Sequence, residues 1–170
     1  MLASDEVAAC TTCGKVICDT HGGACDADGA RHCVSHLAPL ADRPGRKGCE
    51  PHRTTCHVDG VSYSTMGTRP CPVCGKPTCE GHRTACVHCA RQVCTRDMDQ
   101  AKCVTCRHLV EVADPADDLI QAALAANGGE PPRVKTWRTA RDASGTVAEL
   151  DLGWTRRLVF TLAHGELKPK

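Results

Sequence analysis

Large apolar residues are concentrated in the last third of this 170-residue chain, and their spacing there changes from helical to strand-like. Within 114–127, Leu119 and Ala123 lie four residues apart, which places them on one face of an amphipathic helix. Asp114 can cap such a helix, and Pro115 suits its first turn. The Asn-Gly-Gly sequence that follows is typical of a helix end. The pattern therefore predicts a helix over 114–127.

The next segments alternate apolar and polar residues, as half-buried strands do. Ala148, Leu150 and Leu152 fall on one face of one segment. Two turn-like stretches, 142–145 and 153–155, separate the segments and suit hairpins. We therefore expect a small α+β module over 112–166, in which the helix packs on a three-stranded antiparallel sheet. Its strands are predicted at about 133–141, 146–152 and 156–163.

The first 108 residues lack such a pattern because they contain almost no large apolar side chains. The whole chain has one Phe, one Tyr and two Trp, and of these only Tyr63 lies before residue 137. A conventional apolar core in this region cannot offset the entropy lost on folding. Cross-links must therefore help to hold the fold.

Cysteine and histidine recur in this region with a period of about fifteen residues. The units CTTCGKVICDTHGGA, from Cys10, and CPVCGKPTCEGHRTA, from Cys71, show the pattern in full. Each holds a first couplet, C-x2-[CD], and four residues later a second couplet, C-x2-[HD]. A fixed period indicates a tandem repeat. We expect an array of small units with little regular secondary structure beyond short hairpins and helical turns. It spans 8–108 in two blocks, about 8–52 and 53–108.

These couplets have the composition and spacing of zinc ligands, since Zn²⁺ takes four ligands tetrahedrally and favours thiolate and imidazole. Disulfides are the alternative, but His and Asp at couplet positions cannot form them. The sequence shows no secretion-signal pattern, so we expect a reducing, cytoplasmic setting in which disulfides are rare. About five zinc ions are expected. The candidate ligands are Cys10, Cys13, Cys18, His21, Cys25, Asp28, Cys33, His36, Cys49, His52, Cys56, Asp59, Cys71, Cys74, Cys79, His82, Cys86, Cys89, Cys94, Asp97, Cys103 and Cys106.

Three of these candidates are aspartates, which complete couplets in phase with the others: Asp28, Asp59 and Asp97. A carboxylate oxygen is an acceptable zinc ligand. The alternative is that these residues are solvated turn formers and that water or another side chain completes the site. Their phase favours ligation.

The segments CTTCGKVICDTH and CDADGARHCVSH resemble the B-box zinc domain, a two-zinc module of tripartite-motif proteins. Three successive couplets, those beginning at Cys18, Cys25 and Cys33, match its first three couplets. The third ends in His where the family has Cys, and the closing His-x2-His pair of the family is absent. The resemblance implies a zinc-binding style shared by residues 10–106.

In B-box and related cross-brace folds, adjacent couplets bind different ions. The resemblance therefore implies five interleaved sites and leaves Cys49 and His52 without an obvious partner. Local pairing is the open alternative, in which one unit supplies all four ligands. The implied sites are Cys10, Cys13, Cys25 and Asp28; Cys18, His21, Cys33 and His36; Cys56, Asp59, Cys71 and Cys74; Cys79, His82, Cys94 and Asp97; and Cys86, Cys89, Cys103 and Cys106.

The function that fits these features is a non-enzymatic zinc adaptor or scaffold that binds another protein. Every cysteine belongs to a couplet, and no phosphate loop or paired-carboxylate motif is visible. Nucleic-acid binding is the alternative, but the net charge of +1 gives a poor electrostatic footprint. A zinc store or thiol switch is a second alternative. No membrane or small-molecule partner is expected, and high Ala and Arg usage suggests a bacterial genome.

Overall fold

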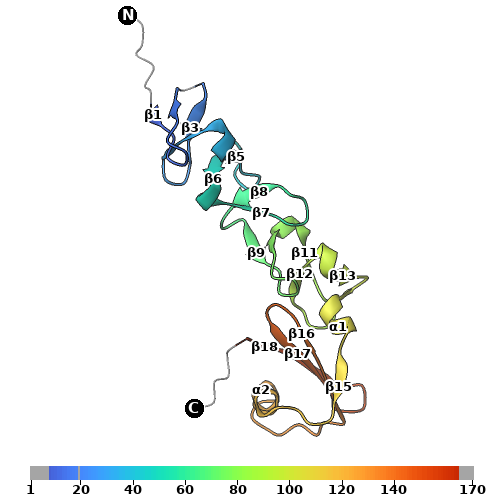
Figure 1. Cartoon of the computed structure of the whole chain (residues 1–170). Helices are drawn as coiled ribbons and strands as arrows, with labels where there is room; N and C mark the ends of the chain where they lie inside the picture. Colours follow the sequence, from blue (N-terminus) through green and yellow to red (C-terminus); the bar gives the residue numbers. More distant parts are fainter. Residues whose placement is uncertain (1–7, 19, 165–170) are drawn as a thin grey trace, which may run out of the picture. The chain divides into compact units, whose positions relative to one another are not determined.

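The computed structural model describes residues 8–18 and 20–164 and divides the chain into two compact units. The first unit runs to Arg69 and includes Lys76–Gly81. The second comprises Pro70–Gly75 and the chain from His82 onward. Figure 1 shows the chain as a succession of short hairpins followed by a longer sheet with one helix against it. No helix among the described residues is long and apolar enough to cross a membrane.

Seven two-stranded hairpins account for the strands before residue 104. They confirm the expectation of short hairpins and helical turns for this region. In chain order the strand pairs are β1 (Ala8–Ala9) with β2 (Val16–Ile17), β3 (Gly22–Ala24) with β4 (Arg31–Cys33), β5 (Leu37–Pro39) with β6 (Lys47–Cys49), β7 (Arg53–Thr55) with β8 (Ser62–Ser64), β9 (Thr68–Pro70) with β10 (Pro77–Cys79), β11 (Arg83–Ala85) with β12 (Gln92–Cys94), and β13 (Met98–Asp99) with β14 (Lys102–Cys103).

Four second couplets form single turns of 3₁₀ helix, and the C-x2-C couplet from Cys103 forms a short α-helix. These are η1 (Val34–His36), η2 (Glu50–His52), η3 (Glu80–His82), η4 (Thr95–Asp97) and α1 (Val104–Arg107).

Each hairpin has a tip, the loop between its strands, and a base, where its strands begin and end. In the second hairpin Ala24 pairs with Arg31 next to the tip, and Gly22 pairs with Cys33 at the base. The first couplet, from Cys25, therefore lies at the tip. The second couplet begins at the last strand residue, Cys33, and lies at the base. Tip and base couplets of one hairpin thus lie at opposite ends of its strands.

The C-terminal module is a four-stranded sheet with the order β15-β16-β17-β18 and antiparallel pairing throughout. Three strands match the prediction, and β15, which pairs with β16, was missed. At three residues β15 is too short to show alternation, and its central residue is a glutamate. The observed bounds are β15 (Val110–Val112), β16 (Thr136–Arg141), β17 (Gly145–Asp151) and β18 (Arg157–Ala163).

The predicted helix is α2 (Asp117–Ala126), which starts later than expected. Ala116 occupies the N-cap without a side-chain cap, so Asp114 does not serve as the cap. The end agrees with the prediction, because Gly128 and Gly129 follow with positive φ. The helix buries Leu119 and Ala123 against Ala148 and Leu150 of β17. Partly buried residues that include Trp137, Leu158, Phe160 and Leu162 surround this core.

Polar contacts join the turn between β16 and β17, and Glu149 of β17, to the last hairpins of the second unit. The Arg91 guanidinium lies 2.7 Å from an Asp142 carboxylate oxygen, and the Thr105 hydroxyl donates to that carboxylate at 2.8 Å. Burial opposes charge on Asp142, yet hydrogen bonds from Arg91, Thr105 and Ser144 lower its pKa. His88 also lies 2.7 Å from the buried Glu149 carboxylate. Ion pairs and a hydrogen bond therefore hold the C-terminal module to the preceding hairpins of the same unit.

Candidate metal centres

Twenty of the predicted ligands form five groups of four, and within each group the potential ligand atoms lie within 4.8 Å of one another. The groups are numbered here in chain order. Group 1 is Cys10, Cys13, Cys33 and His36; group 2 is Cys25, Asp28, Cys49 and His52; group 3 is Cys56, Asp59, Cys79 and His82; group 4 is Cys71, Cys74, Cys94 and Asp97; and group 5 is Cys86, Cys89, Cys103 and Cys106.

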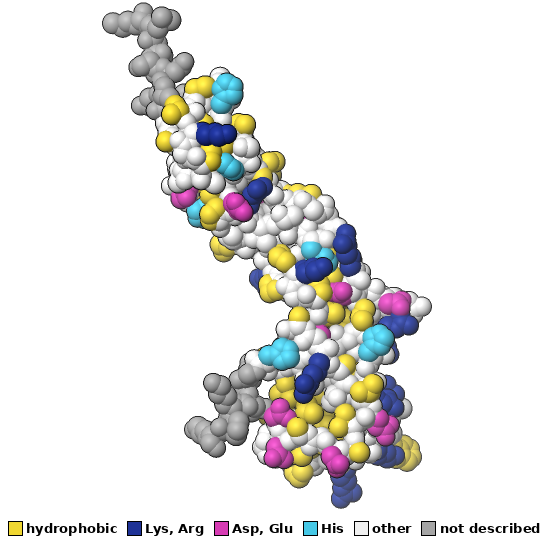
Figure 2. Space-filling model, in the orientation of Figure 1, with side chains coloured by type: hydrophobic (Ala, Val, Ile, Leu, Met, Phe, Trp, Pro, Cys, Tyr) yellow, Lys and Arg dark blue, Asp and Glu magenta, His cyan; other side chains and the backbone are white. Residues whose placement is uncertain are grey.

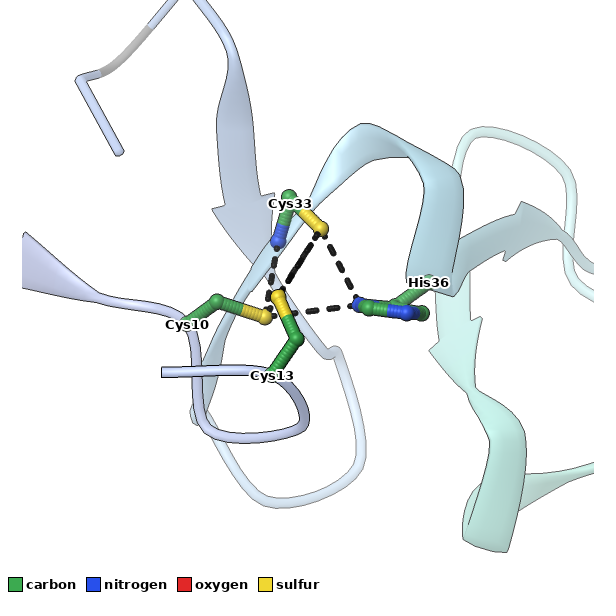
Figure 3. Close-up of side chains that lie close together, drawn as sticks. All are labelled: Cys10, Cys13, Cys33 and His36. Atoms are coloured by element: carbon green, nitrogen blue, oxygen red, sulfur yellow. Dashed lines mark hydrogen bonds between the residues drawn. The ribbon is translucent and has the colours of Figure 1, made fainter. Parts of the chain in front are cut away.

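The spacing inside these groups is close to that around a tetrahedral zinc ion, although some pairs, such as Cys33 Sγ and His36 Nδ1 at 3.0 Å, are closer together. With zinc bonds of about 2.3 Å to sulfur and 2.0 Å to nitrogen, ligands should lie roughly 3.5–3.8 Å apart. In group 1, Cys10 and Cys33 sulfurs are 3.7 Å apart, and Cys10 Sγ is 3.5 Å from His36 Nδ1. Figure 3 shows the four side chains converging on one point. In group 5 the sulfurs of Cys89 and Cys103 are 3.9 Å apart.

The groups join the tip of one hairpin to the base of a following one. Group 1, for example, combines the tip couplet of the first hairpin with the base couplet of the second. This corrects both ligand schemes considered from sequence. Of the five interleaved sets, only Cys86, Cys89, Cys103 and Cys106 is found. Local pairing is also wrong, because no group among the described residues draws both couplets from one unit.

Hairpin length explains the correction. Two couplets of one unit are separated by a strand that rises about 3.3 Å per residue, so they point away from each other. The base of the next hairpin instead sits on the tip of the one before. Its first cysteine donates its backbone N–H to a sulfur at that tip in all five groups, at 3.3–3.5 Å. These bonds run from Cys33 to Cys10, Cys49 to Cys25, Cys79 to Cys56, Cys94 to Cys71 and Cys103 to Cys86.

Cys49 and His52, which had no partner in the interleaved scheme, complete group 2 with Cys25 and Asp28. His52 Nδ1 lies 3.6 Å from Cys25 Sγ and 3.2 Å from Cys49 Sγ. The tip-to-base rule thus assigns them the same role as every other grouped base couplet.

The tip of the third hairpin and the base of the fourth have no cysteine or histidine, and their joint is held without metal ligands. At the tip of the third hairpin Leu40 stands where other tips have their first cysteine, and Ser64 stands at the matching base. The Asp42 carboxylate accepts the Ser64 backbone N–H at 2.8 Å and the Ser64 hydroxyl at 2.5 Å. Leu40 is buried, with 6% of its surface exposed. A carboxylate and an apolar side chain therefore replace the sulfur cluster here.

Each aspartate lies with the three other candidate ligands of its group. Asp97 Oδ2 lies 3.0 Å from Cys94 Sγ and 3.2 Å from Cys71 Sγ. Asp28 also forms a turn, because its Oδ1 accepts the Ala30 N–H at 2.9 Å while its Oδ2 lies 3.4 Å from His52 Nδ1. The two interpretations considered from sequence are therefore compatible: one oxygen shapes the tip and the other faces the cluster.

The pKa values of neighbouring sulfurs within one group shift in opposite directions. Burial raises the pKa of Cys49, and it raises that of Cys103 as well. In Cys10, burial is outweighed by N–H donors, first that of Cys33, which lower its pKa to about 5. A Cys106 hydrogen bond, with help from Arg91, lowers the pKa of Cys89 to about 4, while the pKa of Cys106 is raised. A thiol with a lowered pKa therefore lies beside thiols with raised pKa values, because neighbouring sulfurs repel one another as anions. A bound zinc ion would supply the positive charge that lets them ionise together.

Cys18 and His21 are the two predicted ligands that lie in no group. Cys18 Sγ is 3.1 Å from His21 Nδ1, but among the described residues no tip couplet faces them. Hydrogen bonds from Thr20 and His21 lower the pKa of Cys18 to about 6.

Sequence reasoning missed one aromatic contact to a candidate ligand. The Tyr63 hydroxyl donates to Asp59 Oδ2 at 3.0 Å, in group 3. A hydrogen bond with Cys79, burial and Asp59 together raise the Tyr63 pKa. A lone tyrosine outside the couplets gave no signal for this role.

Comparison with known protein families, with curated proteins and with solved structures finds no match for this chain. The likeness to B-box domains therefore rests on the couplets alone, and four of the five observed groups differ from those that this likeness implied.

Proposed function

We propose that the protein is a non-enzymatic scaffold in which about five structural zinc ions, held in B-box-like couplets, keep a row of hairpins folded for binding another protein. The observation that carries this proposal is the makeup of the five groups: each offers four protein ligands. Catalytic zinc usually has three protein ligands and keeps one position open for water or substrate. Closed groups that link successive hairpins suit a structural role.

The hairpins before residue 104 have too few apolar side chains to be stable without the ions. Before residue 104, ligand cysteines provide most of the fully buried side chains. Structural zinc sites contribute folding free energy directly, and small domains of this kind unfold without metal. The C-terminal module has an apolar core of its own and suits the docking of a partner.

Nucleic-acid binding is the second candidate, and one feature favours it. In the second unit a cavity of about 220 Å³ is lined by Lys102, Arg107, Arg138 and Arg157. However, Glu149 also lines it, 3.1 Å from the Arg138 guanidinium. Lys and Arg are interspersed with Asp and Glu on the visible face of the C-terminal module (Figure 2). Zinc bound by three or four anionic ligands adds negative charge nearby, which disfavours a phosphate backbone.

Two measurements test the structural role. Native mass spectrometry of the protein as purified should count at least five zinc ions, and chelation should abolish far-UV and near-UV circular dichroism cooperatively. An apo protein that keeps its fold would refute the proposal. A zinc store would instead release metal to a competing chelator without loss of partner binding.

Fluorescence anisotropy separates the adaptor from the nucleic-acid binder. Labelled single-stranded and duplex DNA and RNA are titrated with the zinc-loaded protein across a salt series. Binding tighter than ~1 μM at physiological salt, with steep weakening as salt rises, would favour nucleic acid. The adaptor proposal expects weak binding and instead a polypeptide partner that is lost on chelation.

A further inference from the structure

The base of the first hairpin holds a couplet with the geometry of half a metal centre. Cys18 Sγ lies 3.1 Å from His21 Nδ1 and 3.0 Å from the Thr20 hydroxyl. In group 1, Cys33 Sγ lies 3.0 Å from His36 Nδ1 and 3.2 Å from the hydroxyl of the intervening serine. The two couplets are therefore built alike, and only the one from Cys33 is met by a tip.

The surface around this couplet also matches the surfaces that receive tips elsewhere. Five joints share a backbone hydrogen bond between the tip and the base. The residue after the first position of the tip donates its N–H to the carbonyl of the residue two positions before the base couplet begins, as from Thr11 to Arg31. The corresponding residue of the first base is Val16. Its side chain is 72% exposed. Among the described residues, no tip reaches the base that Cys18 and His21 form.

We propose that Cys18 and His21 hold a zinc ion that is completed by a C-x2-[CD] turn of a partner polypeptide. A thiolate and a neutral imidazole leave Zn²⁺ with one net positive charge, so the ion favours two further anionic ligands. A turn with two cysteines, or with cysteine and aspartate, supplies them, as the tips of this chain do in groups 1 and 2. The proposal rests on the structural zinc role proposed above and adds an intermolecular site to it.

A second copy of this chain is a poor source of that turn. Within the described residues, every tip with a C-x2-[CD] couplet already belongs to a group. The tip from Leu40 is engaged by Ser64 and carries no sulfur. A second copy would have to break one of its own centres, whereas a different polypeptide with a vacant turn would not.

The test uses the full-length, zinc-loaded protein and the peptide PCPVCGK, which reproduces residues 70–76. Native mass spectrometry is recorded with added zinc alone and with zinc plus peptide. We expect a complex of one chain, six zinc ions and one peptide. In Cys18→Ala and His21→Ala, peptide affinity should fall by at least about 100-fold, beyond the 10–100-fold typical of losing a hydrogen-bond partner of a ligand. The five other ions should remain.

The controls are His108→Ala, which removes an exposed histidine outside the groups, and a peptide with serine in place of both cysteines. The first should bind the peptide like wild type and the second should not bind. Equal peptide binding by wild type and Cys18→Ala, or no binding by wild type, would overturn the inference. A Cys18-dependent dimer in place of the peptide complex would also overturn it. Fewer than five ions without peptide would instead refute the structural zinc role.

Discussion

At the scale of single residues, the tips depend on a backbone conformation that follows each first couplet. Gly60, for example, has a φ of 74°, and its N–H donates to the Cys56 carbonyl at 2.8 Å. In the sixth unit the same position is Ala90, with a φ of 58° and the same type of bond to Cys86. A left-handed conformation is unfavourable for residues with a Cβ. The tip therefore requires the left-handed conformation even where the residue is an alanine.

This leads to a pair of opposite substitutions. A Cβ added at Gly60 would meet no atom within 4 Å, so Gly60→Ala tests conformation alone. We expect it to lower the free energy of unfolding by about 1 kcal/mol and Ala90→Gly to raise it by a similar amount. Denaturant unfolding at saturating zinc measures both. Gly81→Ala is the control, because that Cβ would also meet nothing and the residue has no positive φ. Equal effects at Gly60 and Gly81 would contradict the explanation.

A second residue-scale prediction concerns Tyr63, whose hydroxyl donates to Asp59 Oδ2 at 3.0 Å. Hydrogen bonds to metal ligands orient them, and their loss typically costs about 10–100-fold in metal affinity. We expect Tyr63→Phe to weaken one of the zinc ions by that factor and leave the others unchanged. Stepwise competition with a chromophoric chelator resolves the weakened ion. Uniform weakening of all the ions would indicate a general loss of stability instead.

At the scale of elements, the joint from Leu40 to Ser64 shows that a tip and a base can meet without metal. Asp42 takes the place of the tip sulfur as acceptor of the base N–H. We expect Asp42→Ala to destabilise the protein by about 1–3 kcal/mol, because a buried donor loses its partner, with no change in zinc count. Thermal unfolding and native mass spectrometry check the two halves of this statement. Arg43→Ala, at a neighbouring exposed position, serves as the control. Loss of a zinc ion in Asp42→Ala would show that the joint is a metal centre after all.

The elements also show what the sequence could and could not reveal. Couplet positions and the core face of β17 follow from residue type and periodicity, and both were predicted. Couplet spacing sets the length of each hairpin, but it does not show that the base N–H of one hairpin donates to the tip of the hairpin before it, and this contact decides which couplets meet. The short strand β15 is defined only by its partner β16. The sequence did not reveal the Asp42–Ser64 joint because Leu40 and Ser64 stand where other tips and bases have a cysteine.

At the scale of the whole molecule, the metal centres differ in what they support. Groups 4 and 5 belong to the compact unit that contains the C-terminal module, whereas groups 1 and 2 belong to the other. Thr105 lies between two ligands of group 5, Cys103 and Cys106, and its hydroxyl donates to Asp142 of the module. Loss of the ion of group 5 should therefore destabilise the sheet, and loss of the ion of group 1 should not.

Both tryptophans, Trp137 and Trp154, lie in the C-terminal module, so their fluorescence reports on it separately from the array. We expect the double substitution of Cys103 and Cys106 by serine to lower the module's free energy of unfolding by at least about 2 kcal/mol. The reason is that metal binding free energy is folding free energy for the segment that holds Thr105. The matched variant, with serine at Cys10 and Cys13, also loses one ion but should leave the fluorescence transition unchanged. A shift of equal size in both variants would mean that the two compact units unfold together, and no shift in either would mean that the sheet stands without the hairpins beside it.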